Sequence, residues 1–398
     1  MQLDANKFDF LVGNFDVLQE MSTVPVLPMF SDEAMEFLSA LSRNLLNNKR
    51  AKSFVDVMSY AYWIRKASLE AAKEKHMDYN KRLGRGVAFH IAPSNVPVNF
   101  AVSMTSSILA GNCTLIRLSQ KEFEQVDIIC EAMNELLENE FQKMKAYFCL
   151  FRYEHDEVVT QELSSMCDVR IIWGGDKTIA TIRKASLPPR AIELAFADRH
   201  SLAVINSDEY LNCNSDEVAR GFYTDTYYTD QNACSSPRIV IWTGNSVAEA
   251  KERFWTTLEN LVRKNYEMKP IQAVDKYTSF CILAMEQEDV QIVSKRNEIM
   301  RVEVKTLDST LMEYKQGGGY FFEYTAKTLE EIIPILSKSC QTISYLGEDK
   351  EKIKQLVFDA GIRGVDRIVP VGQTMGLEFV WDGYKMIEAM SRIVYVGG

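Results

Sequence analysis

The chain has few of the residues and segments that mark metal-binding, secreted or membrane-spanning proteins. Its 398 residues include four histidines, and none is spaced as a metal ligand, so no zinc site is expected. The eight cysteines contain no Cys-x-x-Cys pair, and most fall within apolar periodic stretches, which fits reduced thiols in a cytoplasmic protein. No segment is long and apolar enough to span a bilayer, and the first residues do not resemble a secretory signal.

Basic residues are also fewer than acidic residues. Lysine and arginine total 45 against 55 aspartates and glutamates, a formal net charge of -10. Nucleic acids and anionic membranes bind basic surfaces, so neither is expected as a partner. Glycine and proline are not enriched, and 46% of the residues are hydrophobic, which indicates a globular chain with enough residues for two or more domains.

Beyond a mostly helical region at 1–80, short apolar stretches alternate with amphipathic ones. This alternation predicts a parallel sheet covered on both faces, whose ligands bind outside the carboxyl ends of the strands. A second alternating region begins near Arg238. Strands are predicted at 86–91, 114–118, 146–151, 169–173, 201–205 and 238–242, and helices at 99–110, 122–138, 157–166, 216–230 and 247–266.

One cysteine is a candidate nucleophile. Cys234 lies in Gln-Asn-Ala-Cys-Ser-Ser-Pro at 231–237, between a predicted helix and a predicted strand. A thiol among small and amide side chains at such a junction can be exposed and can receive backbone N–H groups, which favours the thiolate. The alternative is a buried structural cysteine, because free cysteines are commonly buried.

A proline-flanked turn follows the first predicted strand. In Ile-Ala-Pro-Ser-Asn-Val-Pro at 91–97, two prolines fix the backbone and leave Asn95 at the apex. A turn asparagine commonly bonds its own backbone. The functional alternative is an amide donor that stabilises an oxyanion.

Two other strand ends carry residues suited to phosphate. The second strand ends in Arg-Leu-Ser-Gln-Lys at 117–121, where two cations and a hydroxyl could hold a phosphate group. The fourth is followed by Gly174 and Gly175 ahead of a helix, which permits close approach of a pyrophosphate to the backbone. A solvated strand end and an ordinary tight turn are the alternatives, but the order of these segments along one sheet favours a nucleotide site.

Together these segments resemble the aldehyde dehydrogenase superfamily and, within it, the LuxC-like acyl-CoA reductases, or fatty acid reductases. The resemblance runs from about Arg85 to the end of the chain. The segments that match this branch specifically are Gln-Asn-Ala-Cys-Ser-Ser-Pro at 231–237, Gly-Val-Asp-Arg-Ile-Val-Pro-Val-Gly-Gln at 364–373 and Trp-Asp-Gly at 381–383.

The resemblance implies an α/β fold with two doubly wound parallel-sheet domains that share a cleft, together with a helical N-terminus. The N-terminal helices and the NADP-binding domain are expected at 1–192, and the catalytic domain at 193–372. A C-terminal return and oligomerisation segment is expected at 373–398.

The resemblance also implies roles for three residues. Cys234 is expected to be the nucleophile, and Asn95 is expected to supply the oxyanion-hole side chain. Glu193, in Ala-Ile-Glu-Leu at 191–194, is the general-base candidate. The two glycines that follow this glutamate in the superfamily are absent here, and a structural ion pair is the alternative role for Glu193.

A nicotinamide cofactor is implied as well. Arg117 stands where the superfamily places a lysine on the adenine ribose, and Gln120 replaces the acidic residue that reads the 2′-hydroxyl. NADPH is therefore favoured, with NADH possible. The implied cofactor-binding residues are Pro93, Ser94, Arg117, Ser119, Gln120, Lys121, Gly174 and Gly175.

The expected function is NADPH-dependent reduction of an acyl thioester, acyl-CoA or acyl-protein, to an aldehyde through a thioester on Cys234. Two alternatives stay open: an NAD(P)-dependent aldehyde dehydrogenase that runs oxidatively, and a non-redox acyl-carrier subunit. The expected partners are an acyl-CoA substrate, an acyl-activating synthetase and further copies of the chain, paired through the terminal strand at 392–396.

Overall fold

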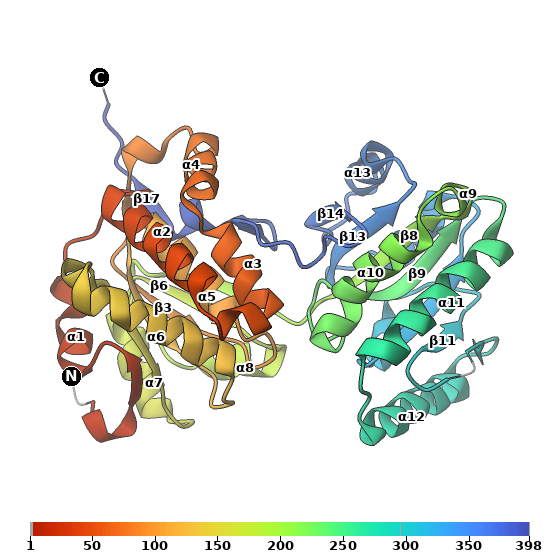
Figure 1. The fold of residues 1–398 in the computed structure, drawn as a ribbon, viewed down its shortest axis with the longest axis horizontal. Coiled ribbons are helices and arrows are strands. Elements are labelled where there is room, and N and C mark those ends of the chain that lie inside the picture. Colours follow the sequence, from red (N-terminus) through yellow and green to blue (C-terminus); the bar gives the residue numbers. More distant parts are fainter. Residues whose placement is uncertain (1–2, 295, 398) are drawn as a thin grey trace. The chain divides into compact units, whose positions relative to one another are not determined.

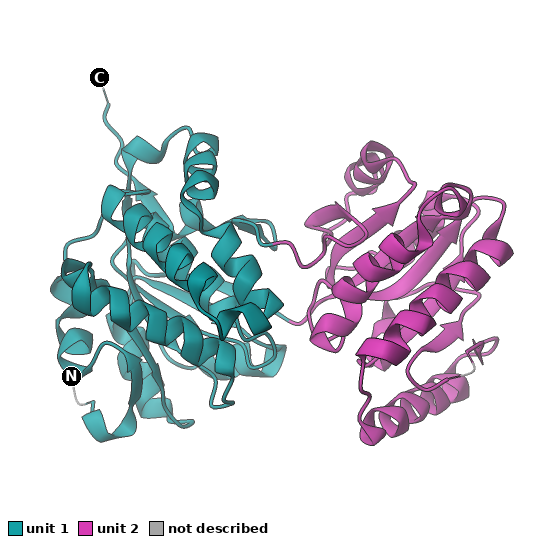
Figure 2. Cartoon of the chain, viewed as in Figure 1, with its two compact units in different colours: residues 1–197, 377–398 teal, residues 198–376 magenta. Residues whose placement is uncertain are grey.

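A computed structural model of the chain describes residues 3–294 and 296–397. The chain forms two compact units (Figure 2). Each has its own sheet and its own apolar cores. Unit 1 comprises residues 1–197 and 377–398, and unit 2 comprises residues 198–376. Both boundaries fall a few residues later than the sequence suggested. The first does so because the strand that carries Glu193 pairs with the sheet of unit 1.

Unit 1 contains a six-stranded sheet in the order β1-β5-β4-β3-β6-β7. Its strands β3 and β6 are labelled in Figure 1. β1 is antiparallel to β5, and the other strands are parallel. The parallel part begins at β3, adds β4 and β5 on one side, and then adds β6 and β7 on the other. The strands are β1 (Asp9–Val12), β3 (Val87–Ile91), β4 (Cys113–Arg117), β5 (Phe148–Arg152), β6 (Val169–Trp173) and β7 (Ile192–Phe196).

Apolar cores lie on both faces of this sheet, and helices cover each of them. Helix ends follow local chemistry. The first long helix begins at Ser31, whose hydroxyl accepts a hydrogen bond from the N–H of Ala34, and the helix after β3 ends at left-handed Gly111. The helices are α1 (Phe15–Glu20), α2 (Asp32–Asn47), α3 (Val55–Trp63), α4 (Lys66–Lys75), α5 (Asn99–Ala110), α6 (Glu124–Asn139), α7 (Glu157–Met166) and α8 (Asp176–Ile182).

The C-terminal residues also belong to unit 1. Helix α14 (Met386–Met390) packs on α5 and buries three apolar side chains in the core that α5 shares. β17 (Ser391–Ile393) pairs antiparallel with β2 (Arg82–Gly84), so the terminal strand pairs within its own chain. A short hairpin, β15 (Val380–Trp381) and β16 (Tyr384–Lys385), precedes α14.

Unit 2 contains a seven-stranded sheet in the order β10-β11-β12-β9-β8-β13-β14, and all but β10 are parallel to their neighbours. Apolar cores again lie on both faces. The strands are β8 (His200–Asn206), β9 (Pro237–Thr243), β10 (Gln291–Ile292), β11 (Met300–Glu303), β12 (Tyr320–Thr325), β13 (Cys340–Leu346) and β14 (Arg367–Pro370). The helices are α9 (Ser207–Leu211), α10 (Ser215–Thr226), α11 (Val247–Asn265), α12 (Pro270–Glu286) and α13 (Lys350–Asp359).

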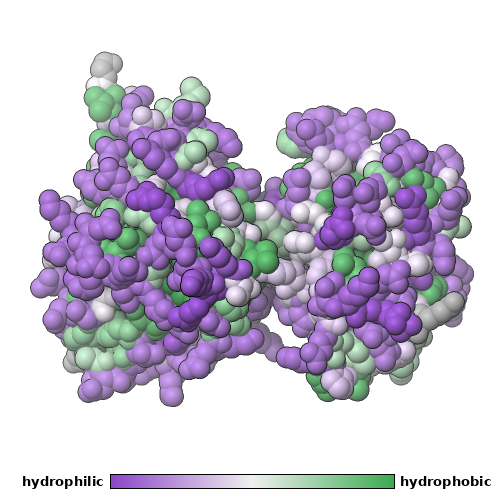
Figure 3. Space-filling view, viewed as in Figure 1, coloured by the Kyte–Doolittle hydropathy of each residue, from purple (hydrophilic) through white to green (hydrophobic). Residues whose placement is uncertain are grey.

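Hydrophilic residues cover most of the face shown in Figure 3, and apolar residues form scattered patches. Within the described residues, no helix combines the length and the apolar character that crossing a membrane requires.

Candidate active site

Cys234 lies in a tight turn of unit 2, which we call the nucleophile turn (residues 230–236), directly before the amino end of β9. Asp230 and Gln231 have left-handed backbone conformations, with φ of 55° and 57°, and reverse the chain after α10. Cys234 is partly exposed and not disulfide-bonded, whereas five of the other seven cysteines are buried. The thiol therefore has the access that a nucleophile needs.

The side chain of Gln231 anchors this turn to two strands. Its Oε1 accepts hydrogen bonds from the N–H groups of Gly319 (2.9 Å) and Tyr320 (3.0 Å). Its Nε2 donates to the carbonyl oxygens of Pro237 (3.0 Å) and Tyr320 (3.1 Å). The buried carboxamide thus uses both of its donors and both of its acceptor positions, and it joins the turn to the starts of β9 and β12.

Three glycines before β12 let the chain approach the nucleophile turn closely. The N–H of Gly318 donates to the carbonyl oxygen of Asp230 at 3.1 Å. A Cβ on Gly317 would lie 2.7 Å from that same oxygen. A Cβ on Gly319, whose φ is +83°, would lie 2.1 Å from the carbonyl oxygen of Glu298. A larger residue at Gly317 would push the turn away, whereas one at Gly319 would clash with the backbone at Glu298.

A buried cation lies near Cys234. Arg238, at the start of β9, is 9% exposed and donates to the carbonyl oxygens of Gln231 and Gln316. Burial lowers the pKa of Arg238 to about 10, and its charge interacts with Cys234. A cation near a thiol favours the thiolate. The sequence reading missed Arg238, although a charged residue at the start of an apolar strand was a usable signal.

In unit 1, the predicted cofactor residues leave the sheet at neighbouring strand ends. Ile91 of β3 pairs with Arg117 of β4 and with Ile172 of β6, which aligns the carboxyl ends of these three strands. This edge includes the point where the strand order reverses, which is where doubly wound sheets bind ligands. The segments brought there carry Pro93, Ser94 and Asn95 after β3, Arg117, Ser119, Gln120 and Lys121 at and after β4, and Gly174 and Gly175 after β6.

Arg117 is held by aromatic residues that follow β5. Its guanidinium carbon lies 4.5 Å from the centre of the Tyr153 ring, and its Nη2 lies 3.5 Å from His155 Nδ1. The hydroxyl of Ser119 accepts a hydrogen bond from the N–H of Lys121 at 3.1 Å. A guanidinium stacked on a ring at a strand end is suited to a phosphate or a ribose. Tyr153 and His155 were not identified from the sequence.

The glycines after β6 leave room at the same edge. A Cβ on Gly175 would meet no atom within 4 Å, and one on Gly174 would touch only the side chain of Thr178, at 3.0 Å. Trp173, at the end of β6, stacks on Phe196 with 3.8 Å between ring centroids. The edge is therefore open at the glycines, and a stacked aromatic pair lies next to them.

Glu193 of β7 is paired with two arginines. Its Oε2 accepts from Arg170 Nη2 at 2.5 Å and Nε at 2.8 Å, and its Oε1 accepts from Arg183 Nε at 2.6 Å. Arg170 is only 3% exposed. Guanidinium groups from two arginines therefore occupy both carboxylate oxygens of Glu193. The geometry favours the structural ion pair over the general-base role.

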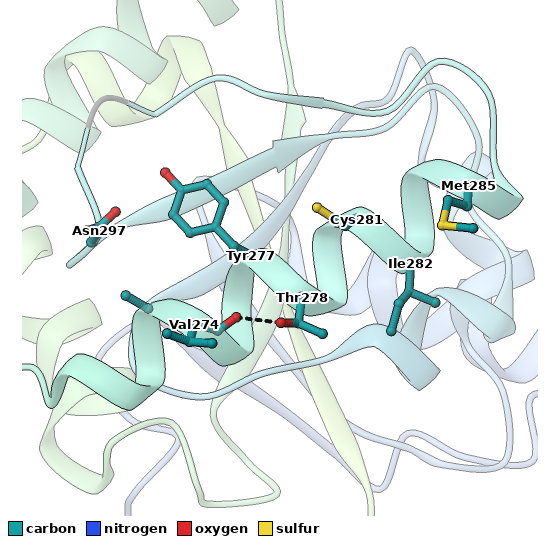
Figure 4. Close-up of a pocket in the computed structure, with 8 residues that line it drawn as sticks. Val274, Tyr277, Thr278, Cys281, Ile282, Met285 and Asn297 are labelled. Atoms are coloured by element: carbon teal, nitrogen blue, oxygen red, sulfur yellow. Dashed lines mark hydrogen bonds between the residues drawn. The ribbon is translucent and has the colours of Figure 1, made fainter.

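Outside these two regions, the described residues offer an apolar groove but no metal site. No group of three or more His, Cys, Asp or Glu residues among them is arranged to hold a metal ion. The groove runs along α12, where the Thr278 hydroxyl donates to the Val274 carbonyl oxygen (Figure 4). It contains none of the predicted site residues, and its lining is Ala273, Val274, Tyr277, Thr278, Cys281, Ile282, Met285 and Asn297.

Comparison with known proteins gives one family. A family model described as acyl-CoA reductase (LuxC) matches residues 11–393. The long-chain acyl-protein thioester reductases of Aliivibrio fischeri and Vibrio harveyi are each 24% identical to this chain, over 300 and 299 residues. Each match covers 74% of this chain and 60% of the relative, so the chain spans about 60% of the length of these curated relatives.

Solved structures with little sequence similarity share the fold. Lactaldehyde dehydrogenase from Escherichia coli matches with a TM-score of 0.66 at 12% identity, covering 100% of this chain and 96% of that one. Aldehyde dehydrogenase 21 from Physcomitrella patens matches with a TM-score of 0.67 at 11% identity, covering 95% and 89%. These matches confirm the predicted aldehyde-dehydrogenase-like α/β fold. The chain belongs to the acyl-CoA reductase (LuxC) family.

Proposed function

We propose that this protein is an oxidoreductase that reduces an acyl thioester to an aldehyde, with the acyl group held as a thioester on Cys234. The observation that carries the proposal is the nucleophile turn. A partly exposed thiol stands there in a backbone fixed by Gln231 and near the buried guanidinium of Arg238. Membership of the acyl-CoA reductase family supports the same chemistry.

The chain's residues account for acyl transfer. The Cys234 thiolate, favoured by Arg238, attacks the acyl carbonyl carbon and gives a tetrahedral oxyanion. Collapse of this oxyanion breaks the carbon–sulfur bond to the donor, which leaves as its thiolate, and the acyl group stays on Cys234. The N–H of Cys234 is a proposed oxyanion donor that contributes on the order of 3 kcal/mol to the transition state. Asn95, after β3, stays the predicted side-chain donor. When bound, a nicotinamide cofactor would supply the hydride that reduces the thioester on Cys234. Breaking of the carbon–sulfur bond would then release the aldehyde and return the Cys234 thiolate.

We infer that the cofactor is NADPH. Arg117, Ser119 and Lys121 are grouped at the carboxyl end of β4, and Gln120 places no carboxylate there to repel a 2′-phosphate. Pro93 and Ser94 follow the neighbouring strand β3, and the glycines after β6 present open backbone to a pyrophosphate. NADH would use the same edge without the phosphate contacts.

The ion-paired state of Glu193 favours reduction over the oxidative alternative. Oxidation of an aldehyde to an acid requires a base that activates water to hydrolyse the enzyme thioester. Arg170 and Arg183 occupy both carboxylate oxygens of Glu193. Without such a base, the acyl group on Cys234 would persist until hydride transfer.

We also propose the class of acyl donor and the partners of this protein. The two curated relatives are named for acyl-protein thioesters, so a carrier protein or an acyl-activating synthetase is a candidate donor beside acyl-CoA. We also propose a homo-oligomer as the working state.

Intact-mass analysis tests the proposal. The protein is incubated with acyl-CoAs of several chain lengths, and then with NADPH or NADH. We expect one acyl adduct, which is absent in Cys234→Ser and present in the control Cys281→Ser. NADPH should release this acyl group as an aldehyde faster than NADH does. Cys281 is the matched control because it is exposed on α12 and does not belong to the nucleophile turn.

The other outcomes separate the alternatives. An adduct that persists with both cofactors would indicate an acyl-carrier subunit. Conversion of added aldehyde to the acid with NAD+ or NADP+ as the oxidant, and with water instead of a thiol as the acyl acceptor, would indicate the oxidative dehydrogenase. If neither acyl-CoAs nor acyl-carrier proteins modified Cys234, the proposal would be wrong.

A further inference from the structure

The segment at 371–376, which follows β14, lies against the nucleophile turn. Ser235, the neighbour of Cys234, donates its hydroxyl to Met375 Sδ at 3.6 Å. Ser235 is 2% exposed and Met375 is partly exposed, so this contact is partly buried. A displacement of the 371–376 segment would therefore shift the backbone around Cys234.

Two charged side chains hold this segment by its backbone. Asp225, near the end of α10, accepts hydrogen bonds from the N–H groups of Gly372 (2.6 Å, to Oδ2) and Thr374 (3.0 Å, to Oδ1). Arg367 donates to the carbonyl oxygens of Thr374 (2.9 Å) and Gly376 (3.4 Å). Both backbone polar groups of Thr374 are thus fixed by charged groups that come from different elements.

Glycines bring α10 and the segment into direct contact. A Cβ on Gly221 of α10 would lie 3.0 Å from the Cα of Gly372, and Gly372 has a φ of +91°. On its other side α10 packs on α11 through the rings of Phe222, Phe254 and Trp255. The helix that carries Asp225 therefore packs against both α11 and the 371–376 segment.

We propose that Asp225 is a positioning residue for acyl transfer. Its ionised carboxylate fixes the 371–376 segment against the nucleophile turn and so holds the N–H of Cys234 where it meets the developing oxyanion. Asp225 does not act on the acyl group itself. The inference rests on the proposed function, because it assumes that Cys234 accepts an acyl group.

The ionisation of Asp225 gives this role a pH dependence. Burial raises the pKa of Asp225 to about 6, although the hydrogen bonds from Gly372 and Thr374 and the charge of Arg367 oppose the shift. Arg367 is the charged group that faces the carboxylate, since α11 meets α10 through aromatic rings. Below that pKa, one carboxylate oxygen carries a proton and holds its N–H partner less well.

The sign of the linked stability separates positioning from unfolding. The pKa of Asp225 is higher in the folded protein than its ordinary value, so the folded state binds this proton more tightly than the unfolded chain does. Protonation of Asp225 therefore stabilises the fold as the pH falls. A loss of acyl transfer near pH 6 would come from a displaced segment and not from unfolding through this group.

The test compares two reactions of Cys234, acylation by an acyl-CoA and alkylation by iodoacetamide, both followed by intact mass. Both need the thiolate, but only acylation passes through an oxyanion, so the ratio of their rates cancels the titration of the thiol. In the wild-type protein we expect the ratio to fall about tenfold from about pH 7 to about pH 5, as Asp225 is protonated.

Substitution provides the second arm. In Asp225→Asn we expect a ratio lower on the order of 10²-fold at neutral pH and independent of pH, because a small displacement of aligned groups costs about this much. Asp216→Asn, on the exposed first turn of the same helix, is the control and should behave as wild type.

Each remaining outcome decides the inference. A wild-type ratio that stays constant with pH, or an Asp225→Asn variant that loses both reactions equally, would overturn it while leaving the proposed function in place. The wild-type arm is decisive even if Asp225→Asn does not fold. Failure of the wild-type protein to form any acyl adduct would overturn the proposed function and this inference together.

Discussion

At the scale of single residues, the partners of a charged group decide its role. Arg170 and Arg238 are both buried arginines of strands, yet Arg170 is neutralised by Glu193, whereas Arg238 is bound to backbone carbonyls and interacts with Cys234. The first arrangement stabilises a pair of charges within the sheet of unit 1. The second leaves a positive charge available to a thiolate.

The pair in unit 1 leads to a prediction about Glu193. Replacing Glu193 with alanine should lower the free energy of unfolding by about 3–5 kcal/mol, because it leaves Arg170 as a buried, unpaired charge. Urea denaturation would measure this loss. Glu70→Ala is the control, because Glu70 pairs with Lys66 at the surface, and it should cost less than about 1 kcal/mol.

Activity provides the contrary outcome for the same variant. Acylation of Cys234 and its discharge by NADPH should survive in Glu193→Ala under conditions where the variant is folded. If Glu193→Ala had wild-type stability but could no longer form or discharge the acyl group on Cys234, the general-base role would be supported instead.

At the scale of elements, helices and strands with a strong local sequence pattern were predicted well, and those defined by contacts with distant residues were not. The bounds of α5, α7 and β6 equal those predicted from periodicity and turn residues. β1 was missed within the N-terminal region read as helical, because it is defined by pairing with β5, more than a hundred residues away. The helix before Cys234 was predicted to reach 230 but ends at Thr226. A short 3-10 helix follows it and leads into Asp230 and Gln231, which have left-handed backbone conformations.

The glycines before β12 allow a prediction for this element. Gly319→Ala should lower the free energy of unfolding by about 3 kcal/mol or more, since it adds a backbone clash with Glu298 to the strain of a positive φ. Gly361→Ala has a positive φ but open space, and should cost about 1 kcal/mol. Urea denaturation of both variants would measure the difference.

Gly319→Ala should also slow acylation of Cys234, because the N–H of Gly319 is one of the groups that hold Gln231. Equal losses of stability in the two variants would show that the Glu298 backbone moves aside at little cost.

At the scale of the whole molecule, the two units differ in how the chain builds them. Unit 2 is one continuous stretch with its own cores. Unit 1 needs two stretches, because α14 and β17 return to it from the end of the chain. Three apolar residues of α14 complete the core beside α5, and each contributes on the order of 2 kcal/mol by burial.

This difference predicts the behaviour of fragments. A chain of residues 198–376 should unfold cooperatively by itself and keep an iodoacetamide-reactive Cys234, but should not bind NADPH. Residues 1–197 should be stable only when 377–398 are joined to them by a linker. Circular dichroism with urea and cofactor fluorescence would check both expectations, and a 1–197 fragment as stable as the joined form would contradict the second.

The sequence by itself determined the family, the alternation of strands and helices, and the place of Cys234 in a turn before a strand, because these depend on residues close together in the chain. Only the tertiary structure decided what surrounds them. Arg238 near the thiol, Asp225 holding the 371–376 segment and the arginines around Glu193 depend on contacts between separate elements. Such contacts form when sheets and helices pack, and no local spacing records them.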